Sequence, residues 1–201
     1  MKNLANFALF NACWFAAVEG AAQGLVWLGP LAFGAMVLHH LVWLVPAGER
    51  RREALYLVGV GLLGASVDTV LHQLDLIVYP TSTAAWPFAV VPPWIVALWV
   101  GFATMPRLSL AWLGRRPLAW AVVLGAIGGP LSFWGGTNFG SIAPGGALWT
   151  TLAVLGVEYG LLMPLMLAFA PAKRGVSAEP AGGSTRGIRK DSRVSGMPAD
   201  V

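Results

Sequence analysis

The apolar residues of this chain form six long stretches that are separated by short polar segments. A helix needs about 20 mostly apolar residues to cross the hydrocarbon core of a bilayer, and each stretch meets or nearly meets that length. The stretches cover residues 4–22, 25–45, 54–76, 87–105, 118–134 and 148–170. The pattern predicts an all-α fold, a polytopic membrane bundle of about six transmembrane helices within residues 1–170.

Composition and the placement of charge support this prediction and add an orientation. The chain is 57% apolar and 11% charged, whereas soluble domains are about 25% charged. Its 13 basic residues lie only before the first stretch, after the second, after the fourth and in the tail. They are Lys2, Arg50, Arg51, Arg52, Arg107, Arg115, Arg116, Lys173, Arg174, Arg186, Arg189, Lys190 and Arg193. By the positive-inside rule both termini are cytoplasmic, which predicts a multi-pass protein of a bacterial inner membrane. The net charge of +4 is then a topology signal, and we expect no nucleic-acid partner.

The two ends of the chain leave alternatives open. The first stretch could be a cleaved signal peptide with residues 4–18 as its apolar region, but Asn6 and Asn11 interrupt that region and favour a retained span. Residues 171–201 are rich in Gly, Ser, Pro and charge and have no apolar period, so they predict a disordered basic cytoplasmic tail. Such a tail is either fully solvated or rests on anionic lipid.

Ionisable residues within apolar stretches are the default candidates for function, because charges inside a bilayer are costly. Here they are Glu19, His39, His40, Asp68, His72, Asp75 and Glu158. No Lys or Arg is among them, which excludes a Schiff-base lysine and an arginine–carboxylate pair within the stretches. At 1.5 Å per residue, Asp68 and Glu158 lie at similar depths, about 12 and 15 Å from the outer ends of their stretches. We therefore predict that Asp68, Glu158 and His72 are catalytic groups that exchange protons, provided that the third and sixth stretches touch.

One helix face carries most of this chemistry. Asp68, His72 and Asp75 are spaced at i, i+4 and i+7, and Gly61 and Gly64 fall on the same face. Glycines allow a neighbouring helix to come close, so this face should point into the bundle. The three polar residues either bind a divalent cation or form a hydrogen-bonded Asp–His pair beside a hydrated Asp75. The second reading is favoured, because the spacing alone is a weak metal pattern.

Other metal and redox chemistry has little support in the sequence. His39 and His40 are either ligands or a proton relay, or else an ordinary imidazole pair near the cytoplasmic side, too far from His72 to share a metal. Cys13 is the single cysteine, which rules out an internal disulfide and a zinc site made of thiolates. We predict no metal and no cofactor.

The fifth stretch contains Gly128-Gly129-Pro130. Pro130 has no N–H group, so the helix must either kink or unwind there, and unwound segments in transporters often frame a binding site. The residues expected to line a cavity are Glu19, Asp75, Gly128, Gly129, Pro130, Ser132, Trp134 and Asn138. A bulky side chain at Gly129 should be damaging, whereas one at Gly145, in an external loop, should do little.

Three segments carry a resemblance to a known family. They are residues 11–29 (NACWFAAVEGAAQGLVWLG), 93–113 (PWIVALWVGFATMPRLSLAWL) and especially 124–140 (LGAIGGPLSFWGGTNFG). Together with the Asp68 region they resemble small proteobacterial inner-membrane proteins catalogued as domain of unknown function 2878, over residues 5–170. The family pattern is often basic at the position of Asn138. Relatives are often encoded beside lipid-modifying enzymes of the cyclopropane fatty acid synthase kind. The resemblance thus implies a connection with lipids but supplies no activity.

Three functions are compatible with these observations. The first is an enzyme or carrier that handles a lipid or another apolar molecule with intramembrane carboxylates. The second is a small proton-coupled transporter, and the third is a non-catalytic accessory subunit whose polar residues only fix helix packing. We favour the first and expect membrane lipids as partners, with either a second copy of the chain or a lipid enzyme as the protein partner.

Overall fold

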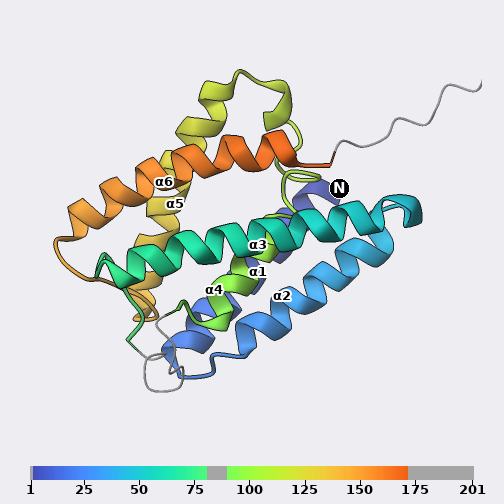
Figure 1. Cartoon of the computed structure of the whole chain (residues 1–201). Coiled ribbons are helices and arrows are strands. Elements are labelled where there is room, and N and C mark those ends of the chain that lie inside the picture. Colours follow the sequence, from blue (N-terminus) through green and yellow to red (C-terminus); the bar gives the residue numbers. More distant parts are fainter. Residues whose placement is uncertain (1, 81–89, 172–201) are drawn as a thin grey trace, which may run out of the picture.

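The residues that the structure describes form an all-α bundle of six helices, as the pattern of apolar stretches predicts (Figure 1). The computed structural model describes residues 2–80 and 90–171. The helices are α1 (Lys2–Ala22), α2 (Leu28–His39), α3 (Arg50–Gln73), α4 (Pro93–Phe102), α5 (Leu118–Phe139) and α6 (Leu148–Phe169). A π-helical turn follows α2 (His40–Leu44), and short 3-10 turns cover Ala47–Glu49 and Leu113–Arg115. The expected tail lies almost wholly outside the described residues.

Four helical segments are long and apolar enough to cross a membrane, which is the character of a multi-pass membrane protein. They are Lys2–Ala22, Ala47–Gln73, Leu118–Phe139 and Leu148–Phe169. The second and fourth predicted spans are shorter than expected, as helices of Leu28–Leu44 and Pro93–Phe102. The ten residues of α4 extend only about 15 Å, half of a bilayer core. Pro93 fits the first turn of this helix, and the chain after Phe102 continues in turns.

Three helices end in the same way at one end of the bundle. The amides of Leu25, Leu76 and Ser141, which follow α1, α3 and α5, bond back to the carbonyls of Gly20, Leu71 and Gly136, over 2.7, 2.9 and 3.3 Å. This is the Schellman motif, which needs one residue in the left-handed conformation. Gly24 and Gly140 (both φ 78°) supply it for α1 and α5, and Asp75 (φ 54°) supplies it for α3.

This geometry changes the interpretation of Asp75. The residue lies beyond the last residue of α3, in a turn, so it does not continue the helix face of Asp68 and His72. The following residues Ile77–Val78 (β1) pair antiparallel with Ala143–Pro144 (β2). A Cβ on Gly145 would overlap the backbone carbonyl of Asp75. The expectation that Gly145 tolerates a larger side chain is therefore wrong.

Helix α4 lies in the middle of the bundle, among α1, α2 and α3 (Figure 1). Trp94 and Trp99 are only 2% and 1% exposed. Glycines make room for its large side chains: a Cβ on Gly64 of α3 would overlap the ring of Trp99, and one on Gly29 of α2 would lie 2.9 Å from the Cβ of Trp94. Gly64 thus allows the close approach that the sequence predicted for this face of α3.

Helices α5 and α6 form a tight antiparallel pair. Cβ atoms on Gly125 and Gly129 of α5 would overlap the backbone and ring of Tyr159 of α6. On the other helix, a Cβ on Gly156 would lie 3.2 Å from the carbonyl oxygen of Ala126, the acceptor that Pro130 cannot satisfy. With α6 packed against this region, α5 continues as one helix through Gly128-Gly129-Pro130, so the helix does not unwind there, which was one of the two outcomes left open by the sequence.

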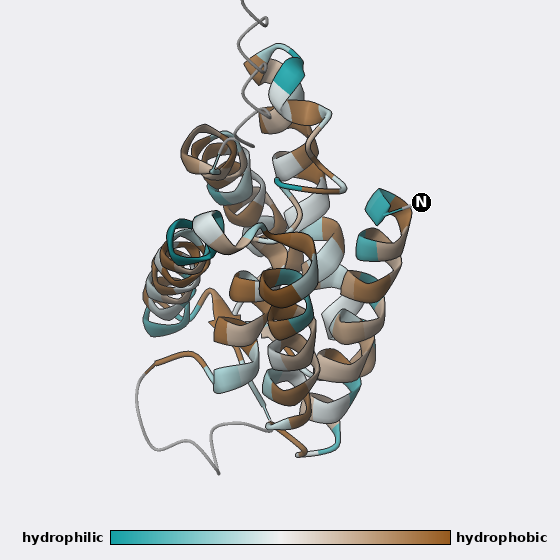
Figure 2. Cartoon of the chain, turned by 90° about the vertical axis from the view of Figure 1, so that its right-hand side faces the viewer, coloured by the Kyte–Doolittle hydropathy of each residue, from teal (hydrophilic) through white to brown (hydrophobic). Residues whose placement is uncertain are grey.

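The bundle has two chemically different ends, which we name by their residues. The basic end carries Lys2, Arg50, Arg51, Arg52, Arg107, Arg115 and Arg116, and the loop end carries residues 23–27, 74–80, 90–92 and 140–147. Hydrophobic residues dominate along the helices, and strongly hydrophilic ones lie mainly near the helix ends (Figure 2). Exposed side chains on the helix surfaces include many large apolar ones, for example Leu31, Leu62 and Leu161. Such a surface suits lipid as the surrounding solvent.

Two adjacent glycines of α5 give a matched test of this packing. Gly129→Ala places a methyl group into the ring of Tyr159, and overpacking of this kind costs about 1–3 kcal/mol. In Gly128→Ala the added methyl group points into open space. Replacing a helical glycine by alanine stabilises the helix by about 1 kcal/mol. We expect the thermal unfolding midpoint of the solubilised protein to fall for Gly129→Ala and to hold or rise for Gly128→Ala. Equal midpoints for the two variants would contradict the α5–α6 packing.

Candidate functional site

The site is built around Asp68, which lies about one turn after Gly64 and two turns after Gly61 on the buried face of α3. Its carboxylate accepts a hydrogen bond of 2.7 Å from the indole Nε1 of Trp99 on α4. On the neighbouring helix α6, the ring of Tyr159 stacks on Trp99 with centroids 5.1 Å apart and planes at 18°. Asp68 is 4% exposed. One hydrogen bond and one aromatic stack therefore join three helices at the centre of the protein.

Glu158 lies beside this stack, one residue before Tyr159. It is 9% exposed, and neither of its carboxyl oxygens has a hydrogen-bond partner among the described residues. It directly precedes Tyr159, whose ring stacks on the same Trp99 that bonds to Asp68. The third and sixth predicted spans are indeed neighbours, because Tyr56 of α3 donates a hydrogen bond of 2.9 Å to the carbonyl of Met166 in α6. The two predicted carboxyls therefore lie on neighbouring helices that the Trp99–Tyr159 stack connects.

An apolar groove of about 570 Å³ lies against Glu158, on the outside of the bundle between α3 and α6. We call it the α3–α6 groove, and its walls include Val67, Leu71, Ala153, Val154, Val157 and Leu161. A second hollow of about 400 Å³ follows between the same two helices, toward the basic end, lined by Tyr56, Met166 and neighbouring apolar residues. Among the described residues, Glu158 is the only Asp, Glu, His, Lys or Arg that lines either hollow.

A small cavity of about 50 Å³ lies near Asp68 in the interior. The residues with polar side-chain atoms that line it are Trp14, Asp68, Tyr79, Trp94, Ser132 and Tyr159. The Tyr79 hydroxyl and the Trp94 indole nitrogen are buried and lack a hydrogen-bond partner among the described residues. Burial raises the pKa of the Tyr79 phenol above its ordinary value, so the hydroxyl keeps its proton and can donate it in a hydrogen bond.

A second buried polar cluster lies at the basic end. Arg107 donates a hydrogen bond of 2.8 Å to Glu53 and also pairs with Glu49, and the Nε2 of His40 lies 2.8 Å from the other oxygen of Glu53. Arg107, Glu53 and His40 are 6%, 0% and 1% exposed. The sequence placed Arg107 in a loop and Glu53 outside the third span, and so excluded such a pair from the spans. The structure instead buries both residues inside the bundle.

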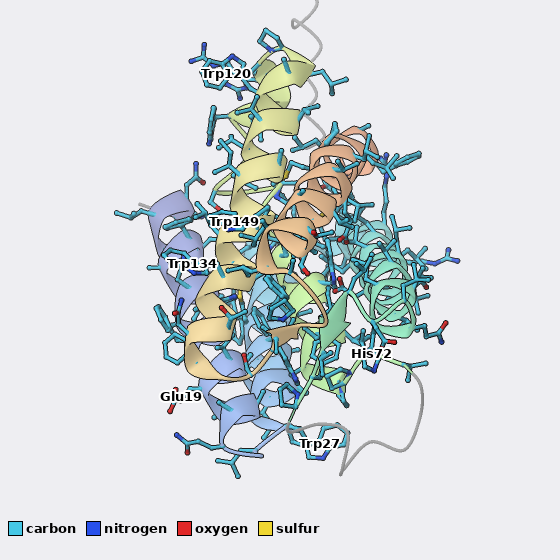
Figure 3. All side chains as sticks on the ribbon, turned by 90° about the vertical axis from the view of Figure 1, so that its left-hand side faces the viewer. Glu19, Trp27, His72, Trp120, Trp134 and Trp149 are labelled. Carbon is cyan, nitrogen blue, oxygen red and sulfur yellow. The ribbon has the colours of Figure 1, made fainter. Side chains whose placement is uncertain are left out.

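The remaining predicted residues near the loop end have local partners. His72 is half-buried, with its Nδ1 2.8 Å from the carbonyl oxygen of Ile77 and its ring against that of Tyr79. It makes no hydrogen bond to Asp68 in the described structure, although the two share a helix face. Glu19 is exposed and accepts a hydrogen bond of 2.6 Å from Gln23. Figure 3 shows Glu19 pointing away from the bundle, toward the same end as Trp27 and His72.

The residues predicted around the α5 break separate into two groups. Gly129 faces Tyr159, and Ser132 lines the cavity and accepts a hydrogen bond of 3.0 Å from the indole of Trp14. Gly128, Trp134 and Asn138 lie on the exposed surface of α5, and Pro130 is half-buried against α6. His39, considered as a ligand, is exposed and stacks on Trp43.

The aromatic partners of the carboxyls were not among the residues predicted from the sequence. Those predictions considered the Asp, Glu and His residues of the apolar stretches. The ring stack and the donors around Asp68 come instead from Trp99, Tyr159, Tyr79 and Trp94. Tyr and Trp each carry one polar atom that needs a partner when buried, so their presence in apolar stretches was a usable signal. Which of the ten tryptophans would be buried required the tertiary structure. In the described parts of the chain, no group of three or more His, Cys, Asp or Glu side chains is placed to hold a metal ion.

The fold and these buried polar groups define a multi-pass membrane protein with ionisable residues inside its helix bundle. The chain matches the family described as protein of unknown function (DUF2878) over residues 3–165 and belongs to that family. The resemblance stated from the sequence is thereby confirmed. Neither the curated proteins nor the solved structures contain a match to the chain.

Removal of Arg107 tests the cluster at the basic end. Arg107→Met leaves the carboxylates of Glu49 and Glu53 without their cationic partner, and breaking a buried pair in this way costs about 3–5 kcal/mol. Arg115→Met, at an exposed position nearby in sequence, is the matched control. We expect Arg107→Met to lower the thermal midpoint and the yield of folded protein strongly, while Arg115→Met leaves both near wild type. If both variants match the wild type, the cluster does not contribute to stability.

Proposed function

We propose that this protein is a six-pass protein of a bacterial inner membrane that binds a lipid or another apolar molecule in the α3–α6 groove. The apolar part of the molecule lies along the groove, and its polar group meets the carboxyl of Glu158, with Asp68 as the neighbouring proton acceptor or donor. The observation that carries the proposal is a buried carboxyl without a partner beneath an apolar, outward-facing groove.

The positions of the helix ends support six crossings. Asn6 near the start of α1 bonds to Thr104 and Ser109, and Arg107 from the same segment pairs with Glu53 at the start of α3. The chain therefore returns to the basic end after α4, even though α4 itself is short. Thr151 at the start of α6 bonds instead to the carbonyl of Leu76 at the loop end. With all described bases at one end, the positive-inside rule places that end in the cytoplasm.

The energetics of burial support a ligand at Glu158. A buried polar group without a hydrogen bond costs about 1–3 kcal/mol in protein mutational data, and proteins seldom keep such a cost without a use. A molecule that enters from the bilayer with a hydroxyl or amine group would provide the missing donor. The volume of about 570 Å³ falls in the range of ordinary ligand pockets, about 300–1,000 Å³.

Proton-coupled transport is the second candidate, and one observation favours it. Asp68 and Glu158 are both buried in the interior, and neither forms an ion pair with a base among the described residues. Two such carboxyls can exchange a proton as their surroundings change. This function would use the same pair without requiring a molecule in the groove.

The test compares the molecules that remain bound after purification. Ala153→Phe fills the α3–α6 groove, and Ala35→Phe adds the same bulk on the exposed face of α2, outside the groove. Glu158→Leu removes the polar floor while keeping an apolar surface. Lipid extracts of each purified variant would be quantified by mass spectrometry, per mole of protein.

We expect the wild type and Ala35→Phe to retain a common lipid or other apolar molecule. Ala153→Phe and Glu158→Leu should retain about tenfold less of it, the change that about 1.4 kcal/mol produces. Equal retention by all four proteins would contradict the proposal. If the wild type retains no such molecule, the proposal is also contradicted. The carboxyls would then serve proton-coupled transport or helix packing in an accessory subunit.

A further inference from the structure

We infer that the cavity between Asp68, Tyr79, Trp94 and Ser132 is a binding site for water inside the bundle. The site is separate from the α3–α6 groove, and nothing in the proposed function requires it. The volume of the cavity and the hydrogen-bonding groups that surround it identify water as the ligand.

The size of the cavity suits water and little else. A cavity needs about 10–15 Å³ to hold one water molecule, and this one measures about 50 Å³. That volume accommodates one to a few water molecules, whereas a lipid headgroup needs far more space. Its walls are not purely apolar, so the argument that keeps hydrophobic cavities dry does not apply.

The donors around the cavity lack partners. The Tyr79 hydroxyl and the Trp94 Nε1 are both buried, at 1% and 2% exposure of their residues, and neither is hydrogen-bonded within the described structure. Both residues line the cavity. An unmet buried donor costs about 1–3 kcal/mol, so a molecule that accepts from both would stabilise the fold.

The acceptors complete the requirement for water, which both donates and accepts. Asp68 lines the cavity, and its carboxylate, which accepts from Trp99 at Oδ2, has the lone pairs to accept a further hydrogen bond. The hydroxyl of Ser132 accepts from Trp14 and can also serve a ligand in the cavity. A buried water usually makes about three hydrogen bonds. Tyr79, Trp94 and Asp68 offer that number.

Bound water would make the two carboxyls chemically unequal. Asp68 would face a hydrated cavity toward the loop end, while Glu158 faces the apolar groove. Proton exchange with the outside would then begin at Asp68.

Radiolytic footprinting tests the inference on the intact protein in lipid nanodiscs. X-ray pulses convert bound water into hydroxyl radicals that oxidise the side chains touching it, and mass spectrometry locates the added oxygen. Trp94 and Trp99 are a matched pair, since both belong to α4 and both are almost completely buried, but only Trp94 lines the cavity. We expect oxidation of Trp94 and Tyr79 to exceed that of Trp99 several-fold.

A filled cavity is the matched variant. Val18 of α1 lines the cavity, and Val18→Ile adds one methyl group there while keeping a branched side chain. Oxidation of Trp94 should then fall toward the level of Trp99. The inference is overturned if Trp94 and Tyr79 of the wild type are oxidised no faster than Trp99. This comparison holds even if the Val18 variant fails to fold, and it does not depend on whether the groove binds a lipid.

Discussion

The rest of the structure depends on how the chain passes through the bundle at α4, a helix of only ten residues. A longer helix would satisfy its own backbone across the membrane, but residues 103–113 continue in turns and are largely buried. In lipid, irregular backbone must find its partners inside the protein. Turns of this segment bond to themselves, Asn6 holds Thr104 and Ser109, and Arg107 is held by Glu53 and Glu49. The buried ion pairs at the basic end thus help to hold residues 103–113 inside the bundle, where a longer α4 would otherwise have continued.

The burial of α4 also explains where the polar chemistry lies. Its two tryptophans fill space that Gly29 and Gly64 leave open, and their indole nitrogens then need acceptors in the interior. Asp68 accepts the hydrogen bond of the Trp99 indole, and the small cavity lies beside Trp94. Tyr159 continues the aromatic stack to α6 and places Glu158 at the adjoining groove. The candidate site is therefore a consequence of how a short aromatic helix is packed.

Much of the helical fold could be predicted from the sequence, because the period and length of apolar stretches reflect local physics. The long helices agree with their predicted ranges to within a few residues, apart from longer ends at α3 and α5. Three features depend on tertiary packing. Pro130 does not unwind α5, which the sequence left open beside a kink, since packing of α6 against the helix overrides the local defect. Asp75 turns the chain instead of extending the face of Asp68, and Arg107 is buried by partners more than 50 residues away in the sequence.

The two carboxyl residues of the candidate site could be predicted from the sequence, but the residues that surround them could not. Depth from the helix ends identified Asp68 and Glu158 as residues at similar levels, because helical rise is constant. Whether α3 and α6 touch, and which aromatic rings lie between them, depends on tertiary packing that no periodicity encodes. The same holds for the groove, whose apolar walls are indistinguishable in sequence from any other lipid-facing surface.

The central claim is that α4 and residues 103–113 together carry the chain from one side of the membrane to the other. Its most direct test is the side from which single cysteines flanking this crossing react, in right-side-out membranes with a membrane-impermeant maleimide and with Cys13 replaced by Ala. Val90→Cys lies before α4 at the loop end, and Gly114→Cys follows it in open space at the basic end. The account predicts labelling of position 90 in intact membranes and of position 114 only after permeabilisation. Labelling of both positions from the same side would contradict it.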